Sequence, residues 1–252
     1  MSLTLKNSFK NWLRALLLPI PLVGLLYLPR YFSHLYRYSR KLSSRQLFFK
    51  DLYPCLYDQT VETPFDSHYF YQSAWLSREL KKLNPSRHVD IGSSVMMVGV
   101  LSAQVDTLFL DFRPLAVDLP GLTSMAGTIL DLPFSSQSVP SVSCLHVLEH
   151  IGLGRYGDPL DAFGSEKAAS ELQRIVANEG SLFLSVPVGR QRTCFNAHRV
   201  FYPQTITTFF SELDLISFSY VDDDGNFYVN QPLDLASSLE YGCGMFHFKK
   251  RI

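Results

Sequence analysis

The chain of 252 residues is long enough for one large domain with an extension, and a hydrophobic content of 46% excludes an intrinsically disordered protein. Its formal net charge is zero, but the first 50 residues carry nine Lys and Arg side chains and no Asp or Glu. The rest of the chain holds 14 basic against 23 acidic side chains. This split predicts a basic arm that meets an anionic partner, attached to an acidic body.

The N-terminal segment holds an uninterrupted apolar run of 14 residues, Ala15–Leu28, which is short for a membrane-spanning helix of about 20 residues. Pro19 and Pro21 lie inside it, and no small-x-small cleavage site of a signal peptide follows. The run and its basic neighbours predict that residues 1–60 bind the inner, cytoplasmic face of an anionic membrane. The alternative is a helix that packs on the body of the protein, residues 61–252.

Residues 31–66 have no clean periodicity and are expected to form a connecting region. Apolar residues at helical spacing then predict a helix over Ser67–Leu83, with Trp75 in the core, that ends before Asn84 and Pro85.

After Pro85, short apolar runs alternate with helical patterns. The expected strands are Arg87–Ile91, Thr107–Asp111, Ser124–Thr128, Ser141–His146, Ser181–Val186, Leu215–Val221 and Gly244–Lys249. The expected helices are Val95–Ala103, Leu115–Leu122, Ser165–Asn178 with Ser165 as N-cap, and Pro203–Glu212. This alternation predicts a Rossmann-like α/β fold, with a mostly parallel sheet and helices on both faces.

The four cysteines are scattered, without a Cys-x-x-Cys pair or other metal-ligand spacing: Cys55, Cys144, Cys194 and Cys243. We therefore expect no metal centre, and a chain of this length does not need disulfides. Cys144 lies in an apolar stretch typical of a buried strand, where a free thiol is the usual state. Free thiols indicate a reducing compartment, the cytoplasm.

The first candidate site follows the strand expected over Arg87–Ile91, where Asp90, Gly92 and Ser93 lead into a turn of small residues. Glycine lets the backbone turn sharply, and small residues let a ligand approach the main chain. Further on, Asp111 ends the next strand, where a carboxylate in nucleotide-binding α/β folds binds the two ribose hydroxyls. The pair predicts a cofactor with a nucleoside part, either NAD or S-adenosylmethionine.

A third element separates these two cofactors. The segment Asp131–Phe134 and the strand running into Val147–His150 resemble the pattern of class I S-adenosylmethionine-dependent methyltransferases. Glu171–Gly180 is similar to a helix-to-strand turn that follows in that group, and the likeness covers residues 86–221. Within the group, Val147–Pro159 and Phe195–Arg199 resemble an uncharacterised methyltransferase-like family that is often associated with bacterial surface-polysaccharide genes.

The resemblance implies a class I methyltransferase fold that binds S-adenosylmethionine, with Asp131 and Leu132 at the adenine. It places His146, Glu149 and His150 at the carboxyl end of the fourth strand, His146 on the cofactor side and the other two on the catalytic side. A hydroxyl acceptor needs a general base, for which histidine is the common choice. Tyr156 belongs to a long loop that is expected to cover the acceptor.

The first loop departs from the Asp-x-Gly-x-Gly-x-Gly pattern of the group, because Ser94 and Met96 occupy its second and third glycine positions. Side chains at these positions are expected to crowd the methionine part of the cofactor. Structural alternatives also stand for the candidate residues: Asp111 could cap a turn, Asp131 could cap a helix or form an Asx turn, and His150 could hold the loop through backbone carbonyls.

The leading hypothesis is therefore methyl transfer from S-adenosylmethionine to a small-molecule, sugar or lipid-linked acceptor. The alternative is a methyltransferase fold without catalysis that serves as a binding or scaffold protein at the membrane, which the altered glycine loop favours. A dehydrogenase is a third hypothesis, against which the Asp131–His150 segment argues. No nucleic-acid partner is expected, because the chain lacks an Asn-Pro-Pro-Tyr-like motif for a flipped base. The oligomeric state stays open.

Overall fold

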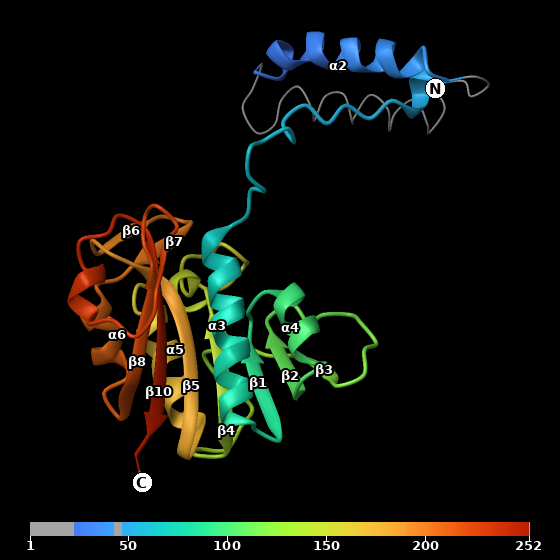
Figure 1. Cartoon of the computed structure of the whole chain (residues 1–252). Coiled ribbons are helices and arrows are strands. Elements are labelled where there is room, and N and C mark those ends of the chain that lie inside the picture. The colour runs from blue at the N-terminus through green and yellow to red at the C-terminus, as the bar shows by residue number, and fades with distance from the viewer. Residues whose placement is uncertain (1–22, 43–46, 252) are drawn as a thin grey trace. The chain divides into compact units, whose positions relative to one another are not determined.

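A computed structural model describes residues 23–42 and 47–251, and the chain divides into two compact units, residues 1–65 and 66–252 (Figure 1). In the first unit, helix α2 spans Gly24–Ser39 and includes Pro29, and a short 3-10 helix, η1, spans Phe49–Asp51. The Arg30 guanidinium donates a hydrogen bond to the Leu56 carbonyl at 2.7 Å, which ties the segment after the helix to α2.

Helix α2 continues well into the region that the sequence analysis expected to be a connection. Leu28, Phe32, Leu35 and Ser39 recur along it at helical spacing, which the many tyrosines between them obscured. The predicted membrane-binding run Ala15–Leu28 lies largely outside the described residues. Within 23–42 and 47–251, no helix is long and apolar enough to cross a membrane.

The second unit is built on a mixed sheet in the order β3-β2-β1-β4-β5-β10-β8-β9. Its strands are β1 Arg87–Ile91, β2 Asp106–Asp111, β3 Leu122–Ala126, β4 Val139–Leu145, β5 Val176–Val188, β8 Leu213–Val221, β9 Phe227–Tyr228 and β10 Gly242–Lys250. Neighbours from β3 to β5 are parallel, whereas β10 is antiparallel to both β5 and β8. A separate hairpin pairs β6 Arg192–Cys194 with β7 His198–Val200. The predicted α/β fold with a mostly parallel sheet is confirmed.

Helices cover both faces of the sheet, as predicted. On one face lie α3 Ser67–Leu83 and α4 Val95–Leu101, and on the other α5 Gly164–Ile175 and α6 Pro203–Phe209 (Figure 1). Strand β5 shows why both faces need cover: Leu182 and Leu184 pack with the α5 side, whereas Phe183 packs with the α3 side. Alternate side chains of a strand point to opposite faces, so a strand buried on both sides is apolar throughout.

Helix α3 matches its predicted bounds because its two ends are defined by local chemistry. The Asp66 carboxylate accepts the Tyr69 backbone N–H at 3.1 Å, which caps the first turn. Asn84 ends the helix in the left-handed conformation, with a φ of 49°, and Pro85 prevents its continuation. Trp75 is buried, as expected.

The helix expected over Leu115–Leu122 is wrong, since this segment is irregular and leads into β3. Pro120 and Gly121 explain the error. Proline lacks the N–H that a helix needs, and Gly121 has a φ of 78° and passes so close to Ser102 that a Cβ would lie 2.4 Å from its carbonyl oxygen. The strand expected at Ser124–Thr128 accordingly begins two residues earlier.

The helix predicted over Ser165–Asn178 is shifted towards the N-terminus. It begins at Gly164, so Ser165 is not its N-cap, and the Ser165 hydroxyl instead donates to the Leu148 carbonyl at 2.8 Å. Strand β5 starts directly at Val176, and the predicted turn at residues 178–180 forms a bulge within it, with Glu179 at a φ of 60°.

Candidate functional site

The site lies where the chain reverses its direction across the sheet. Strands β1, β2 and β3 follow one another outward, and the chain then returns to place β4 on the other side of β1. In open α/β sheets, ligands bind at the carboxyl ends of the strands at such a switch point. A cavity lies here, lined by side chains from the ends of β1, β2 and β4 and from the loops that follow β2, β3 and β4.

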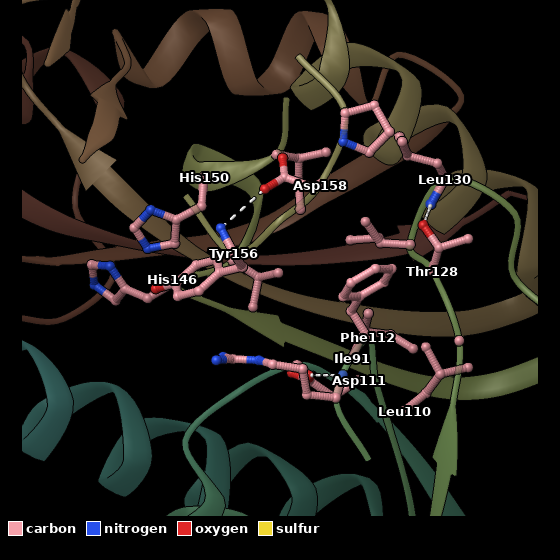
Figure 2. A pocket seen from close by; sticks show the side chains of 17 residues that line it. Ile91, Leu110, Asp111, Phe112, Thr128, Leu130, His146, His150, Tyr156 and Asp158 are labelled. Carbon is pink, nitrogen blue, oxygen red and sulfur yellow. Dashed lines mark hydrogen bonds between the residues drawn. The ribbon is translucent and has the colours of Figure 1, made fainter. Parts of the chain in front are cut away.

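Figure 2 shows how the labelled residues surround this cavity: Asp111 and Ile91 lie on one side, and His146, His150 and Tyr156 gather across from Thr128 and Leu130.

Asp111 presents a carboxylate to the cavity at the end of β2. One oxygen, Oδ1, accepts the backbone N–H of Arg113 at 2.7 Å, which fixes the orientation of the side chain. The other, Oδ2, would lie 3.3 Å from a Cβ placed on Gly92, whose φ is 66°. A side chain at Gly92 would therefore fill the space beside this carboxylate. The turn-capping alternative is correct for one oxygen of Asp111, and the arrangement leaves the second as an acceptor for a ligand hydroxyl.

A buried polar network supports the glycine turn from below. The Asp90 carboxylate accepts the Ser93 backbone N–H at 3.0 Å and a hydrogen bond from the Ser143 hydroxyl. Burial raises the pKa of Asp90 to about 6. The His88 ring lies between the Ser141 and Ser143 hydroxyls, at 2.8 Å from each, and burial lowers its pKa to about 3. Asp90 therefore supports the turn from within the protein and does not line the cavity.

The two residues that replace the expected glycines do not enter the cavity. Ser94 is the N-cap of helix α4, which starts at Val95. Met96 lies in the first turn of this helix, and its side chain is 78% exposed. Ser93 is buried, and its hydroxyl accepts the Leu145 N–H at 3.0 Å, which joins the turn to β4. Neither Ser94 nor Met96 therefore lines this cavity.

The loop over residues 151–164 is fixed around the Asp158 side chain. Its carboxylate accepts backbone N–H groups of Gly152 at 2.8 Å, Tyr156 at 3.2 Å and Gly154 at 3.3 Å. Burial opposes the charge on Asp158, but these backbone hydrogen bonds outweigh it and lower the pKa of the carboxyl group. The Tyr156 ring, 40% exposed, lies beneath the Arg113 guanidinium at 4.8 Å. The loop thus places an aromatic ring at the edge of the cavity.

The hairpin β6–β7 holds this loop from outside. Arg199 donates to the Ile151 carbonyl at 2.7 Å and lies 3.4 Å from the carbonyls of Asp161 and Ala162. A second contact joins the hairpin to the loop: the Ala197 carbonyl accepts a hydrogen bond from His150 Nδ1 at 2.7 Å. The two segments that resembled one family, Val147–Pro159 and Phe195–Arg199, therefore contact each other.

Three ionisable side chains follow β4 in sequence. His146 Nδ1 lies 2.8 Å from Glu149 Oε1, and His150 Nε2 lies 3.7 Å from the same oxygen. Burial disfavours a charge on His146, but its electrostatic interactions and hydrogen bonds with Cys243 and Glu149 outweigh it and raise the pKa of His146 well above its usual value. Because His150 Nδ1 donates to a carbonyl, the neutral ring keeps its lone pair on Nε2.

Five of the residues proposed from the sequence line the cavity: Gly92, Asp111, His146, His150 and Tyr156. Asp90, Ser93 and Glu149 are buried behind its wall. Asp131 and Leu132 do not themselves line it, whereas Leu130, directly before them, does. The Asp131 backbone N–H donates to the Thr128 carbonyl, and the Asp131 side chain is exposed. Leu132 is buried in the core.

Among the lining residues that sequence reasoning did not propose are Phe112, Arg113 and Thr128. Phe112 and Arg113 directly follow Asp111, so the adjacency itself was the available signal. Thr128 follows Gly127, whose missing side chain lets β3 end tightly against Leu110.

Comparisons with known proteins agree with this architecture. A family model described as "Caenorhabditis protein of unknown function, DUF268" matches residues 135–240, which include the Asp158 loop and the hairpin. No protein of curated function matches the sequence. Many solved structures match the fold, and proteins described as methyltransferases are among them.

The N-methyltransferase NodS of Bradyrhizobium japonicum WM9, in complex with S-adenosyl-L-homocysteine, is 15% identical at a TM-score of 0.51, over 72% of this chain and 87% of that one. A putative sarcosine dimethylglycine methyltransferase of Galdieria sulphuraria is 12% identical at 0.51, over 72% and 86%. The [4+2]-cyclase SpnF is 8% identical at 0.50, over 70% and 82%. The chain therefore has a methyltransferase-like fold, which by itself does not fix the reaction.

Proposed function

We propose that this chain binds S-adenosylmethionine and transfers its methyl group to a small-molecule, sugar or lipid-linked acceptor. The observation that carries the proposal is the free Oδ2 of Asp111, held beside the side-chain-free Gly92 at the switch point of the sheet. An oriented carboxylate in this place suits the two hydroxyls of a ribose. The similar fold of NodS, whose structure contains S-adenosylhomocysteine, supports the choice of cofactor.

The remaining lining residues fit the rest of such a cofactor. Ile91, Leu110, Ile129 and Leu130 provide apolar surface for a purine ring, and Thr128 adds a hydroxyl. When bound, S-adenosylmethionine supplies a methyl group that its sulfonium already activates. The protein then has to align the acceptor with that methyl group and exclude water.

On the acceptor side, His150 is the proposed general base. Its Nδ1–H is fixed on the Ala197 carbonyl, so Nε2 is the atom that takes a proton from an acceptor hydroxyl. Glu149, 3.7 Å from Nε2, stabilises the charge that His150 then acquires. Tyr156 lies edge-on to the His150 ring, with 5.7 Å between the ring centres, and limits the access of water.

The alternative of a fold without catalysis drew its support from Ser94 and Met96. Neither side chain lines the cavity, which weakens that argument for an inactive protein. We retain it as an outcome of the test.

Calorimetric titration of the full chain with S-adenosylmethionine, S-adenosylhomocysteine and NAD tests the proposal. Binding of the two sulfur compounds without NAD is the expected result. Binding of NAD alone would favour a dehydrogenase, and binding of none of the three would exclude a cofactor-dependent transferase.

For the N-terminal unit we propose contact with the cytoplasmic face of an anionic membrane. The described part of α2 supports this, since Leu25 and Leu26 are exposed and Arg30 and Arg37 lie on the same helix. An acceptor linked to lipid would be met at that surface.

A further inference from the structure

Three side chains from distant parts of the sequence meet beside the candidate site. His68 lies in the first turn of α3, His146 follows β4, and Cys243 is the second residue of β10. One nitrogen of each histidine and the Cys243 sulfur all lie within 4.8 Å of one another. His146 and Cys243 are buried, and His68 is partly exposed.

The spacing of the two buried atoms is that of two ligands on one metal ion. His146 Nε2 lies 3.4 Å from Cys243 Sγ. Zinc binds thiolate at about 2.3 Å and imidazole at about 2.0–2.1 Å, so two such ligands at a tetrahedral angle are about 3.5 Å apart. The pair could therefore accept zinc between them with little movement.

Glu149 adds the outer partner that metal-bound histidines usually have. Its Oε1 lies 2.8 Å from His146 Nδ1, which places the proton on Nδ1 and leaves Nε2 as the atom facing Cys243. Metal-binding histidines commonly donate their second N–H to a carboxylate, which fixes the ring and raises its basicity. The arrangement of Glu149, His146 and Cys243 matches this pattern.

We propose that His68, His146 and Cys243 bind a zinc-type divalent ion, with Glu149 orienting His146. Two imidazoles and a thiolate select zinc over magnesium or calcium, which prefer oxygen ligands. Three protein ligands leave one position of a tetrahedral ion open.

A simple thiol–imidazole hydrogen bond is the competing explanation for His146 and Cys243. That bond does not involve His68, whose ring stacks on both His146 and Tyr241, with ring centres 5.7 and 5.3 Å apart. His68 therefore distinguishes the two explanations.

Because His146 also lines the cavity, an ion held here would lie at the acceptor side of the candidate site. There its open position could bind and acidify an acceptor hydroxyl, a role that rests on the proposed methyl transfer. Metal binding itself does not depend on that function.

The test uses the full-length chain stripped with a chelator and titrated with Zn²⁺ in competition with a chromophoric chelator. We expect one equivalent of zinc to bind, His68→Ala and Cys243→Ser to lower the affinity at least 100-fold, and Glu149→Gln to lower it about 10- to 100-fold. Cys194→Ser is the matched control, a free cysteine outside the cluster, and should bind as the wild type does. Co²⁺ in place of Zn²⁺ should give a sulfur-to-metal absorption band that Cys243→Ser removes.

His68 is partly exposed, so His68→Ala should stay folded, which thermal unfolding checks. Equal zinc affinity of wild type and folded His68→Ala, or a cobalt complex without the sulfur band, would overturn the proposal. Titrating the same chains with S-adenosylhomocysteine separates the outcomes: lost cofactor binding with intact zinc binding counts against the proposed function alone.

Discussion

Replacing Asp111 by alanine should weaken the binding of S-adenosylhomocysteine about 10- to 150-fold. Its Oδ1 already accepts the Arg113 N–H, so the ligand gains chiefly the hydrogen bonds made by Oδ2. A hydrogen bond to a charged group contributes about 1.5–3 kcal/mol, which corresponds to that range of affinity. Asp111→Asn keeps one carbonyl oxygen and should lose less. Calorimetric titration measures all three proteins directly.

Asp106 provides the matched control, because it is the same residue type at the opposite end of the same strand. Its carboxylate lies 3.5 Å from Arg87 on the surface, away from the cavity. Asp106→Ala should therefore bind the ligand as the wild type does. If Asp111→Ala is folded and binds with unchanged affinity, the placement of the ribose at the end of β2 is incorrect.

Three further outcomes are expected. Given an acceptor, His150→Ala should lower turnover about 100- to 10,000-fold and Tyr156→Ala should also lower it, with little change in cofactor affinity; a parallel loss of cofactor binding would mean that they only support the loop. Full-length chain should float with anionic liposomes at low salt and a chain lacking residues 1–50 should not; if both stay behind, the membrane proposal fails. In the folded chain the pKa of His88 is lowered to about 3. The neutral His88 ring therefore contributes to the free energy of unfolding above pH 6.5. This contribution is lost as the pH falls, because the unfolded chain binds a proton that the folded chain does not bind. Between pH 6.5 and 5 the wild type should lose about 1.5 kcal/mol more unfolding free energy than His88→Gln, measured with urea, and equal losses would contradict the buried neutral state.

The order of strands and helices was predictable because burial on both faces leaves a strong signal in the sequence. β1 and α3 match their predicted bounds, since each is delimited by residues that stop it: Pro85 and Asn84 between them, and Gly92 after the strand. The segment before β3 was not predictable in this way. It contains enough apolar residues for a helix, and its path depends on a contact between Gly121 and the distant Ser102 carbonyl.

The residues of the candidate site likewise fall into those that local sequence could predict and those that only the fold brings together. Residues that end a strand or directly follow one, such as Asp111, Gly92 and His146, could be proposed from the sequence because strand ends meet at one edge. The pattern of residue types placed Asp131 one residue beyond the lining residue Leu130, because it does not show where a turn reverses the chain. The meeting of His68 with Cys243 has no signature in the sequence, since the residues are brought together by the fold alone.

The reversed direction of β10 has a consequence for how this fold can diversify. Because β10 is antiparallel to β5, its first residues lie at the edge where β5 ends, with Gly242 opposite Val188 and Cys243 opposite Pro187. The stretch before it, residues 222–241, therefore leads to the edge where β5 ends, whereas Gly92 and Asp111 come from the other half of the sheet. If the proposed methyl transfer holds, insertions or exchanges in that one stretch would alter the β5–β10 edge and leave the Gly92 and Asp111 half of the sheet intact, so the two halves could evolve separately within a single chain.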